Sequence, residues 1–398
     1  MLTHDNVAKN GVVVAAIEGF TDYTGASNVI MSDFSQWGPT DDFRIKPDIS
    51  AKGVAVYSSN MLTATSVNGY GSYDGTSMAA PSVTAVFALW QQYFKELNFI
   101  SGLENMRAAS LKALMAHTAS PAGKYVFQNA TLVSSPGPNP VFGWGVINAK
   151  GGAEVLGKAF EQNPTAVFKE LQLANGSEYV LNVTLDGTKQ LNATIAWTDL
   201  PSNVVSGTDS NVPLLINDLD LRVYRPDDTA MVDPAMPYRL NKNWSNLYTT
   251  TGDNDVDPIE KVNYFSEFDG LAEAGTYKIV VKHKGTLTGG SQKFSLVVDG
   301  GVVSFSEGSL SVKEGEFENL KIYPNPATDV LNISSDLVTI GGAKVTVYDM
   351  LGKKVYENNS LFEYAGEASI DVSNFNTGVY LVEILKDNKK DTRKIIVK

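Results

Sequence analysis

The sequence predicts an α/β domain at the N-terminal end of the chain, followed by two all-β sandwich domains. Three observations support this order. Up to about Gly157, a continuous apolar run of strand length is combined with segments that are apolar at helical spacing. From about Thr165 to Val303 the helical spacing disappears, and short alternating segments are separated by loops of Gly, Asn, Asp and Pro. The remaining residues, from 319 to 398, form a second and smaller set of alternating segments.

The N-terminal domain is predicted to span residues 1–160. Its run Val12–Ile17 is apolar at every position, as expected of a strand that is buried on both faces. Residues 77–97 and 105–118 are apolar at intervals of three and four residues, which predicts two helices. Strands and helices mixed in this way are typical of a parallel sheet covered by helices.

The middle domain is predicted to span residues 165–303 and to form an antiparallel β-sandwich. Residues 304–318 are polar and acidic, which predicts a linker. The C-terminal domain, residues 319–398, is predicted to be a compact sandwich of about seven short strands, with a hairpin-type turn at residues 349–352.

Composition excludes several classes of protein and site. The 398 residues carry a formal net charge of -12, with a pI of about 4.8, whereas nucleic-acid-binding proteins normally present a basic surface. No apolar run approaches the roughly 20 residues of a membrane-spanning helix. Because the chain has no cysteine, disulfides, thiolate metal sites and cysteine nucleophiles are excluded. A catalytic histidine would have to be one of three residues: His4, His117 and His283.

The segment Gly75–Pro81, which reads Gly-Thr-Ser-Met-Ala-Ala-Pro, places Ser77 at the start of the longer predicted helix. Proline is tolerated only near the first turn of a helix, so Pro81 indicates that the helix begins close to Ser77. A serine at this position lies among backbone N–H groups that have no helical partner and would stabilise a developing oxyanion. Two roles stay open on this evidence, a catalytic nucleophile or a simple N-cap.

The same segment closely resembles the nucleophile motif of the subtilisin-like serine proteases, the subtilases. Segments Ser35–Thr40, Arg44–Ile49 and Phe142–Ala149 resemble further blocks of that family in the same order. The resemblance implies that residues 1–160 form the C-terminal half of a doubly wound parallel-sheet domain. It also implies that Ser77 attacks peptide bonds of protein or peptide substrates, while a His accepts its proton and an Asp orients that His.

The Asp block, the His-Gly-Thr block and the oxyanion Asn of the family are not found in this sequence. His4 does not stand in His-Gly-Thr, and His117 lies on the apolar face of a predicted helix, where a packed core histidine is expected. We therefore expect the chain to be part of a larger secreted serine endopeptidase and to be inactive alone, because subtilisins that lose Ser or His lose about 10⁶ in kcat. The alternative is a non-catalytic secreted or surface binding protein with a remnant protease domain.

Acidic residues gather in two clusters of the middle domain, one with Asp218 and Asp220 and the other with Asp253, Asp255 and Asp257. Carboxylates bunched on loops suit Ca²⁺, which takes six to eight oxygen ligands. These five residues are therefore candidate calcium ligands, with solvated acidic turns as the alternative. Residues 214–223 also resemble a strand-entry motif of the jelly-roll domain in one subtilase branch, where calcium sites are common.

The segment Leu320–Asp329 resembles the start of the type IX secretion sorting domain of Bacteroidetes, and residues 347–353, 378–382 and 394–398 continue that pattern. The resemblance implies that outer-membrane secretion machinery recognises residues 319–398 and that the protein is secreted or held at the cell surface. The alternative is a generic adhesive β-sandwich. Cargo of this system also carries a signal peptide, and residues 1–6 show no such pattern. This agrees with our expectation of a larger parent protein.

Overall fold

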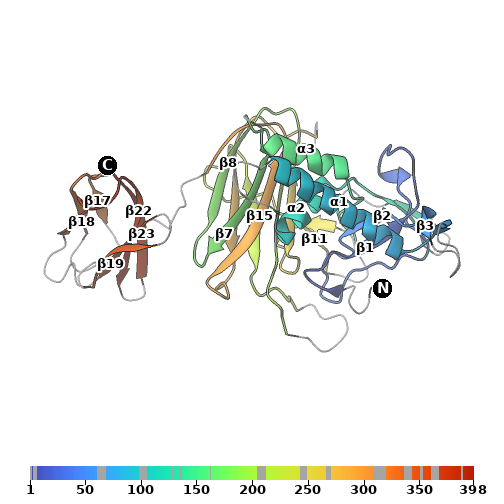
Figure 1. Cartoon of the computed structure of the whole chain (residues 1–398), viewed down its shortest axis with the longest axis horizontal. Coiled ribbons are helices and arrows are strands. Elements are labelled where there is room, and N and C mark those ends of the chain that lie inside the picture. Colours follow the sequence, from blue (N-terminus) through green and yellow to red (C-terminus); the bar gives the residue numbers. More distant parts are fainter. Residues whose placement is uncertain are drawn as a thin grey trace. The chain divides into compact units, whose positions relative to one another are not determined.

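Figure 1 shows the computed structural model of the chain, which forms two compact units, Met1–Ser309 and Leu310–Lys398. Most elements are β-strands, and none of the helices among the described residues is long and apolar enough to cross a membrane. The structure describes residues 2, 7–60, 69–97, 105–127, 130–133, 137–161, 163–203, 212–242, 249–265, 270–307, 320–335, 343–349, 353–359, 367–386 and 389–398.

The N-terminal part of the first unit combines short strands with helices. In order, its elements are β1 (Val14–Ile17), the short 3₁₀ helix η2 (Ala26–Asn28), β2 (Ile49–Lys52), β3 (Val56–Asn60), β4 (Gly69–Tyr73), α1 (Thr76–Leu97), α2 (Ala108–Thr118), β5 (Lys124–Phe127), β6 (Ala130–Val133) and α3 (Ala149–Ala159). Strands β1 and β2 are parallel, and α1 packs on both of them. The predicted strand and both predicted helices are therefore present, each within three residues of its expected start.

Helix α3 has no counterpart in the sequence prediction. Its N-terminus is capped by Asn148, whose side-chain oxygen accepts a hydrogen bond from the Gly151 N–H at 2.8 Å. The Trp90 indole of α1 donates to the Ala149 carbonyl at 2.9 Å, and a Cβ on Gly152 would collide with that ring. Close packing against α1 therefore positions this helix.

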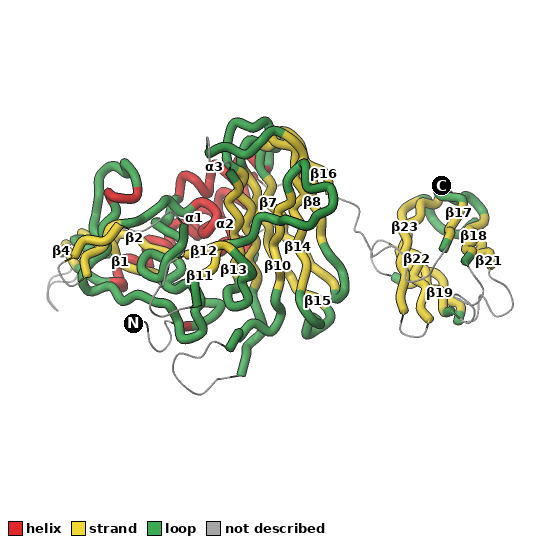
Figure 2. The backbone as a smooth tube through the Cα atoms, turned by 180° about the vertical axis from the view of Figure 1, so that it is seen from behind, coloured by secondary structure: helices red, strands yellow, loops and turns green. Residues whose placement is uncertain are grey.

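The rest of the first unit contains two antiparallel sheets of four strands, with strand orders β13-β9-β15-β7 and β10-β14-β8-β16, which lie face to face (Figure 2). Their strands are β7 (Val167–Ala174), β8 (Tyr179–Leu185), β9 (Leu191–Trp197), β10 (Leu219–Tyr224), β13 (Ile259–Tyr264), β14 (Gly275–His283), β15 (Ser291–Asp299) and β16 (Val302–Glu307), and β11 (Tyr238–Leu240) pairs with β12 (Thr249–Thr251) beside them. Apolar side chains of both sheets form one core between them.

Helices α2 and α3 cover the outer face of the β13-β9-β15-β7 sheet (Figure 1). Ala196 of β9 and Val297 of β15 belong to the same apolar core as α1, α2 and α3. Strand β8 therefore alternates between buried and half-buried residues, whereas β9 is buried at nearly every position. This shared core unites the two predicted domains, residues 1–160 and 165–303, in one compact unit.

Buried polar contacts also join these two parts of the unit. The Lys9 ammonium lies 2.6 Å from an Asp199 carboxylate oxygen, and both side chains are almost fully buried. Asn10 exchanges two hydrogen bonds with the Asp199 backbone, at 2.8 and 3.0 Å. The Ile45 N–H donates to the Asp257 carboxylate at 2.9 Å. Segments at the N-terminal end are thus held by loops of the sandwich.

The predicted linker at residues 304–318 begins too early. Residues Val302–Glu307 form β16, which pairs with β8, because main-chain hydrogen bonding at the edge of the sheet outweighs the polar composition of this segment. The rest of the predicted linker, residues 308–318, lies outside the described residues.

The second unit has seven strands among its described residues, as predicted. They are β17 (Lys321–Tyr323), β18 (Val330–Ser334), β19 (Lys344–Asp349), β20 (Lys354–Asn358), β21 (Glu367–Asp371), β22 (Gly378–Lys386) and β23 (Lys389–Val397). They form two antiparallel sheets, β17-β18-β21 and β20-β19-β22-β23, around an apolar core. The last strand is held on both sides, because Val397 also bridges Ala327 in parallel.

Candidate active site

Ser77 is the second residue of α1, and its side chain is exposed to solvent. The opposite face of the helix is anchored in the core by four buried residues, Ala79, Val83, Trp90 and Phe94. The first N–H groups of a helix have no helical partner. The structure therefore presents the Ser77 hydroxyl at a rigid, partly positive helix start, as the sequence predicts.

Two glycines shape the turn that leads into Ser77. Gly75 has φ +152°, and its carbonyl accepts a hydrogen bond from the Met78 N–H at 3.0 Å. Its own N–H donates to the Gly53 carbonyl at 2.8 Å, which ties the turn to the end of β2. A Cβ on Gly53 would lie only 2.5 Å from the Ala16 Cβ. Glycine at position 53 thus permits the close approach that fixes the serine relative to β1 and β2.

Pro81 lies within the second turn of α1. Because proline has no N–H, the carbonyl of Ser77, four residues earlier, receives no helical hydrogen bond from it. The proline thus removes one helical hydrogen bond from the first turns of α1, directly after Ser77.

The described histidines are engaged elsewhere. His117 is 6% exposed, its Nδ1 lies 2.9 Å from the Thr194 hydroxyl, and its Nε2 lies 3.2 Å from an Asp299 oxygen. Despite its burial, the pKa of Asp299 is lowered by its contacts with His117. Thr194 is completely buried and His117 almost so, and these two side chains therefore belong to the interior of the unit. The predicted core role of His117 is confirmed.

His283 ends β14 and accepts a hydrogen bond from the Gly176 N–H at 2.7 Å, which confirms its place in the sandwich. His4 lies outside the described residues. Within the part of the chain that the structure describes, neither His117 nor His283 forms a hydrogen bond with Ser77. Among the described residues, neither histidine is therefore in position to act as a general base for Ser77.

The five calcium candidates do not form one group. Asp218, Asp220 and Asp253 converge on the Lys284 ammonium, at oxygen distances of 2.9, 3.4 and 2.8 Å. Asp255 instead lies 2.5 Å from the Lys242 ammonium.

Asp257 is 4% exposed and accepts hydrogen bonds from the Ile45 N–H and the Asn254 amide. Burial raises the pKa of Asp257 to about 7. Among the described residues, no three carboxylate or histidine side chains are arranged to hold a metal ion. Protein cations and backbone donors are the partners that this structure shows for the acidic clusters, and the predicted calcium site stays a prediction.

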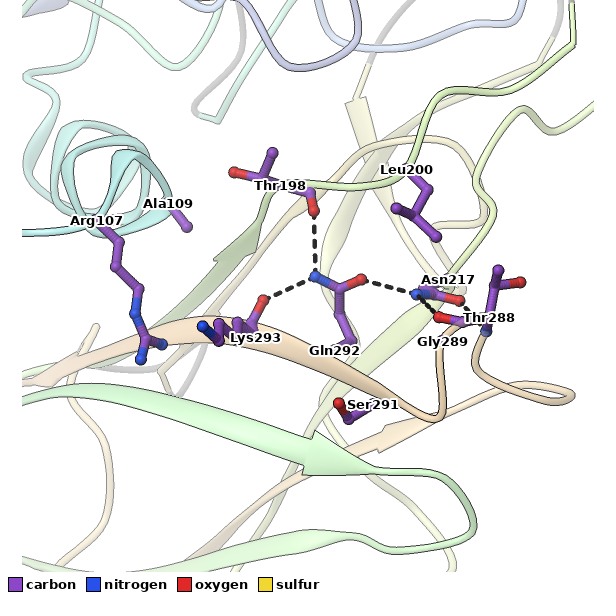
Figure 3. Close-up of a pocket in the computed structure, with 10 residues that line it drawn as sticks. All are labelled: Arg107, Ala109, Thr198, Leu200, Asn217, Thr288, Gly289, Ser291, Gln292 and Lys293. Carbon is purple, nitrogen blue, oxygen red and sulfur yellow. Dashed lines mark hydrogen bonds between the residues drawn. The ribbon is translucent and has the colours of Figure 1, made fainter.

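Sequence reasoning missed a pocket of about 560 Å³ in the same unit (Figure 3). It lies between the start of α2, at Arg107, and the turn that leads into β15. On one wall, the Asn217 amide donates to the Gln292 amide oxygen at 2.8 Å, and the Gln292 amide donates to the Thr198 carbonyl at 3.2 Å. Its lining residues come from widely separated segments, so no local pattern could have indicated it.

Comparison with known families assigns both ends of the chain. The Subtilase family matches residues 3–145, a range that contains Ser77, the blocks Ser35–Thr40 and Arg44–Ile49, and the beginning of the block Phe142–Ala149. The Secretion system C-terminal sorting domain matches residues 321–398. These ranges agree with the resemblances that the sequence motifs indicated.

Curated proteins support the protease assignment. The Serine protease/ABC transporter B family protein tagB of Dictyostelium discoideum is 30% identical over 51% of this chain and 13% of its own length. A PII-type proteinase of Lacticaseibacillus paracasei is 30% identical over 35% of this chain and 7% of its own length. The related Dictyostelium protein tagA is 27% identical over 77% of this chain and 17% of its own length.

This chain therefore spans less than a fifth of the length of each of these three relatives. The predicted localisation is confirmed, because a C-terminal sorting domain of this kind indicates export to the cell surface or the extracellular space. Residues 3–145 belong to the subtilase family of serine proteases, and residues 321–398 are a type IX secretion system sorting domain.

Proposed function

We propose that the protein is a secreted serine endopeptidase in which Ser77 is the nucleophile. The observation that carries this proposal is the exposed Ser77 hydroxyl at the start of α1, inside the segment that matches the subtilase family. A solvated hydroxyl held on a helix that is anchored in the core is positioned to attack a peptide carbonyl. The substrates are accordingly peptide bonds of proteins or peptides.

The proposed mechanism needs a general base that accepts the Ser77 proton and a carboxylate that orients that base. His117 does not serve, because it is buried against Thr194 and Asp299, and His283 does not serve, because it lies at the end of β14, where its Nε2 accepts a hydrogen bond from the Gly176 N–H. We propose that the base comes from outside the described residues. The helix start at Thr76 and Ser77 would contribute N–H donors to the oxyanion.

The fold supports a finer assignment. The parallel pair β1–β2, covered by α1, agrees with the C-terminal half of a doubly wound parallel-sheet domain, and the two antiparallel sheets that follow agree with a jelly-roll domain. We further propose that the seven-stranded unit, residues 319–398, is recognised by the outer-membrane secretion machinery of a Bacteroidetes bacterium.

A fluorophosphonate probe tests the nucleophile. In the protein secreted from its native gene, we expect the probe to label Ser77 and Ser77→Ala to lower kcat by about 10⁶. Ser82→Ala is the matched control, because Ser82 lies on the same helix and bonds only weakly to the Met78 carbonyl, at 3.4 Å. Both variants should fold, because neither side chain carries a core contact.

The 398-residue chain purified alone should hydrolyse neither casein nor peptide esters and should not be labelled. Stoichiometric labelling of this isolated chain would show that it contains its own base, with His4 the first residue to substitute. If the native secreted protein takes up no probe, the alternative, a non-catalytic surface binding protein with a remnant protease domain, replaces the protease assignment.

A further inference from the structure

The pocket beside the start of α2 contains two buried amide side chains, Asn217 and Gln292, which we call the amide pair (Figure 3). Asn217 is 2% exposed and Gln292 is 7% exposed. The Thr288 N–H donates to Asn217 Oδ1 at 2.8 Å, and the Asn217 amide donates to the Thr288 carbonyl at 3.2 Å and to Gln292 Oε1 at 2.8 Å. The backbone of Thr288 therefore fixes the orientation of both amides.

The four amide hydrogens of the amide pair are used within the protein. In addition to the two that Asn217 donates, Gln292 Nε2 donates to the carbonyls of Thr198 at 3.2 Å and Lys293 at 2.9 Å. Each amide oxygen accepts one hydrogen bond from the described residues and keeps a second lone pair. The amide pair can therefore accept hydrogen bonds from a ligand, but it has no hydrogen left to donate.

The charged residues of the pocket lining are cations. Arg107 and Lys293 are among the described lining residues, and no carboxylate is. The segments that carry these two cations meet at Ser110 and Ser295, whose hydroxyl oxygens lie 2.8 Å apart. The whole chain has 44 acidic and 32 basic residues, so a pocket lined by cations alone differs in charge from the average surface. This lining favours a negatively charged ligand.

Arg107 is partly neutralised, whereas Lys293 is not. Arg107 Nε lies 3.2 Å from Glu170 Oε2, and Arg107 Nη1 donates to the Leu171 carbonyl at 3.0 Å. The Arg107 side chain is 36% exposed, and a guanidinium has five N–H donors, so donors remain for a ligand. The exposed Lys293 ammonium forms no ion pair with the described residues. The pocket therefore carries a net positive charge.

Size and apolar surface narrow the class of ligand further. The volume of about 560 Å³ lies within the roughly 300–1,000 Å³ of sites for small organic molecules, and a single inorganic anion would leave most of it empty. Leu200, which is 38% exposed, adds an apolar side chain to the lining. A matching ligand combines a negative charge, N–H donors for the amide oxygens and an apolar group.

We propose that this pocket binds a short peptide segment in which a carboxylate lies next to an apolar side chain. The carboxylate would contact Lys293 and Arg107, and the apolar side chain would pack on Leu200. The carboxylate can belong to an acidic side chain or to a free C-terminus. If the protein is the endopeptidase proposed above, such segments belong to its substrates or to its cleavage products, but the binding itself does not require Ser77.

Calorimetry with the full chain carrying Ser77→Ala tests the proposal, because this parent variant binds peptides without turnover. The probes are acetyl-Leu-Asp amide, acetyl-Leu-Asn amide, acetyl-Ala-Leu with a free carboxylate, and the amide of that last peptide. We expect at least one of the two acids to bind at least about tenfold more tightly than its neutral counterpart, since a hydrogen bond to a charged group is worth about 1.5–3 kcal/mol. The acid that binds more tightly identifies the source of the carboxylate.

Substitutions in the parent variant assign the contacts. Lys293→Met should weaken binding of the preferred acid about tenfold and leave the Tm unchanged, and Lys293→Arg should retain the binding. Leu200→Ala should weaken binding about fivefold. Lys282→Met is the matched control, because Lys282 is an exposed lysine of β14 that does not line the pocket, and it should bind as the parent does.

Three results would overturn the proposal. One is equal affinity for each acid and its neutral counterpart, or no binding of any probe at millimolar concentration. Another is unchanged affinity in a folded Lys293→Met chain. The third is tighter binding of galacturonic acid than of the peptides, which would make the ligand an acidic sugar. Because every variant carries Ser77→Ala, these results are separate from the labelling that tests the nucleophile.

Discussion

Substitution of Asp199 should weaken the contact between the two halves of the first unit. Its carboxylate accepts hydrogen bonds from the Lys9 ammonium at 2.6 Å, the Ile216 N–H at 2.8 Å and the Asn217 N–H at 2.9 Å. Asp199→Ala would leave the Ile216 and Asn217 N–H groups without this acceptor. It would also leave the largely buried Lys9 ammonium without a counter-charge, with the Leu200 and Leu214 carbonyls at 2.8 Å as its remaining acceptors. Breaking a buried ion pair from one side costs about 3–5 kcal/mol.

This cost can be converted into a shift of the melting temperature. A unit of 309 residues has an unfolding entropy of about 0.65 kcal/mol/K, so we expect Asp199→Ala to lower its Tm by about 5–8 °C. Because Lys9 loses its carboxylate partner, hydrogen exchange in residues 7–17 should accelerate more than exchange in β8, although Asn10 keeps its two hydrogen bonds to the backbone of residue 199.

Asp227→Ala is the matched control, because that carboxylate is 73% exposed and should contribute less than about 0.5 kcal/mol to stability. Lys9→Met should lower the free energy of unfolding by less than Asp199→Ala does. In that variant the Ile216 and Asn217 N–H groups keep the Asp199 carboxylate as their acceptor. A change of less than 1 °C for Asp199→Ala, or uniform acceleration of exchange across the unit, would refute the idea that this ion pair holds the two halves together.

Three further predictions concern other parts of the chain. Burial raises the pKa of Asp257 to about 7, so between about pH 4 and pH 7 the folded state holds a proton that the unfolded state has released. The free energy of unfolding should therefore fall as the pH rises through this range and remain low above it. Asp257→Asn should reduce this slope in urea titrations, and an unchanged slope would exclude Asp257 as its source. Gly53→Ala should destabilise the unit by about 1–3 kcal/mol, because its Cβ would collide with Ala16, whereas Gly11→Ala should be neutral in the same thermal melt. Deletion of residues 319–398 should abolish export in a secretion assay and leave the Tm of the first unit unchanged, and a lowered Tm would show that the two units depend on each other.

The sequence was sufficient for those features that local pattern controls. Apolar periodicity located α1 and α2, and the proline at position 81 placed Ser77 at the start of α1, one residue from the observed helix boundary. Alternating polarity likewise indicated the seven strands of the sorting domain. These features depend on residues that are neighbours along the chain, so hydrogen bonding and side-chain direction within one segment were enough to predict them.

Tertiary structure decided what those elements contact. Helix α2 covers the outer face of β9 and buries Thr194 and Ala196 on that face. The residue pattern within the strand does not predict this burial. The same contacts merge two predicted domains into one unit.

Long-range packing also determined the surroundings of the acidic residues. Lys284, which follows β14, lies 2.8 Å from Asp253 in the loop before β13, although the two residues are far apart in the sequence. Asp257 contacts a different part of the unit, because it accepts a hydrogen bond from the Ile45 N–H. A cluster of carboxylates in the sequence is compatible with a metal, a solvated loop or an internal cation. The choice between them depends on which distant side chain the fold brings within about 3 Å, because the energy of a buried charge is set by its nearest partners.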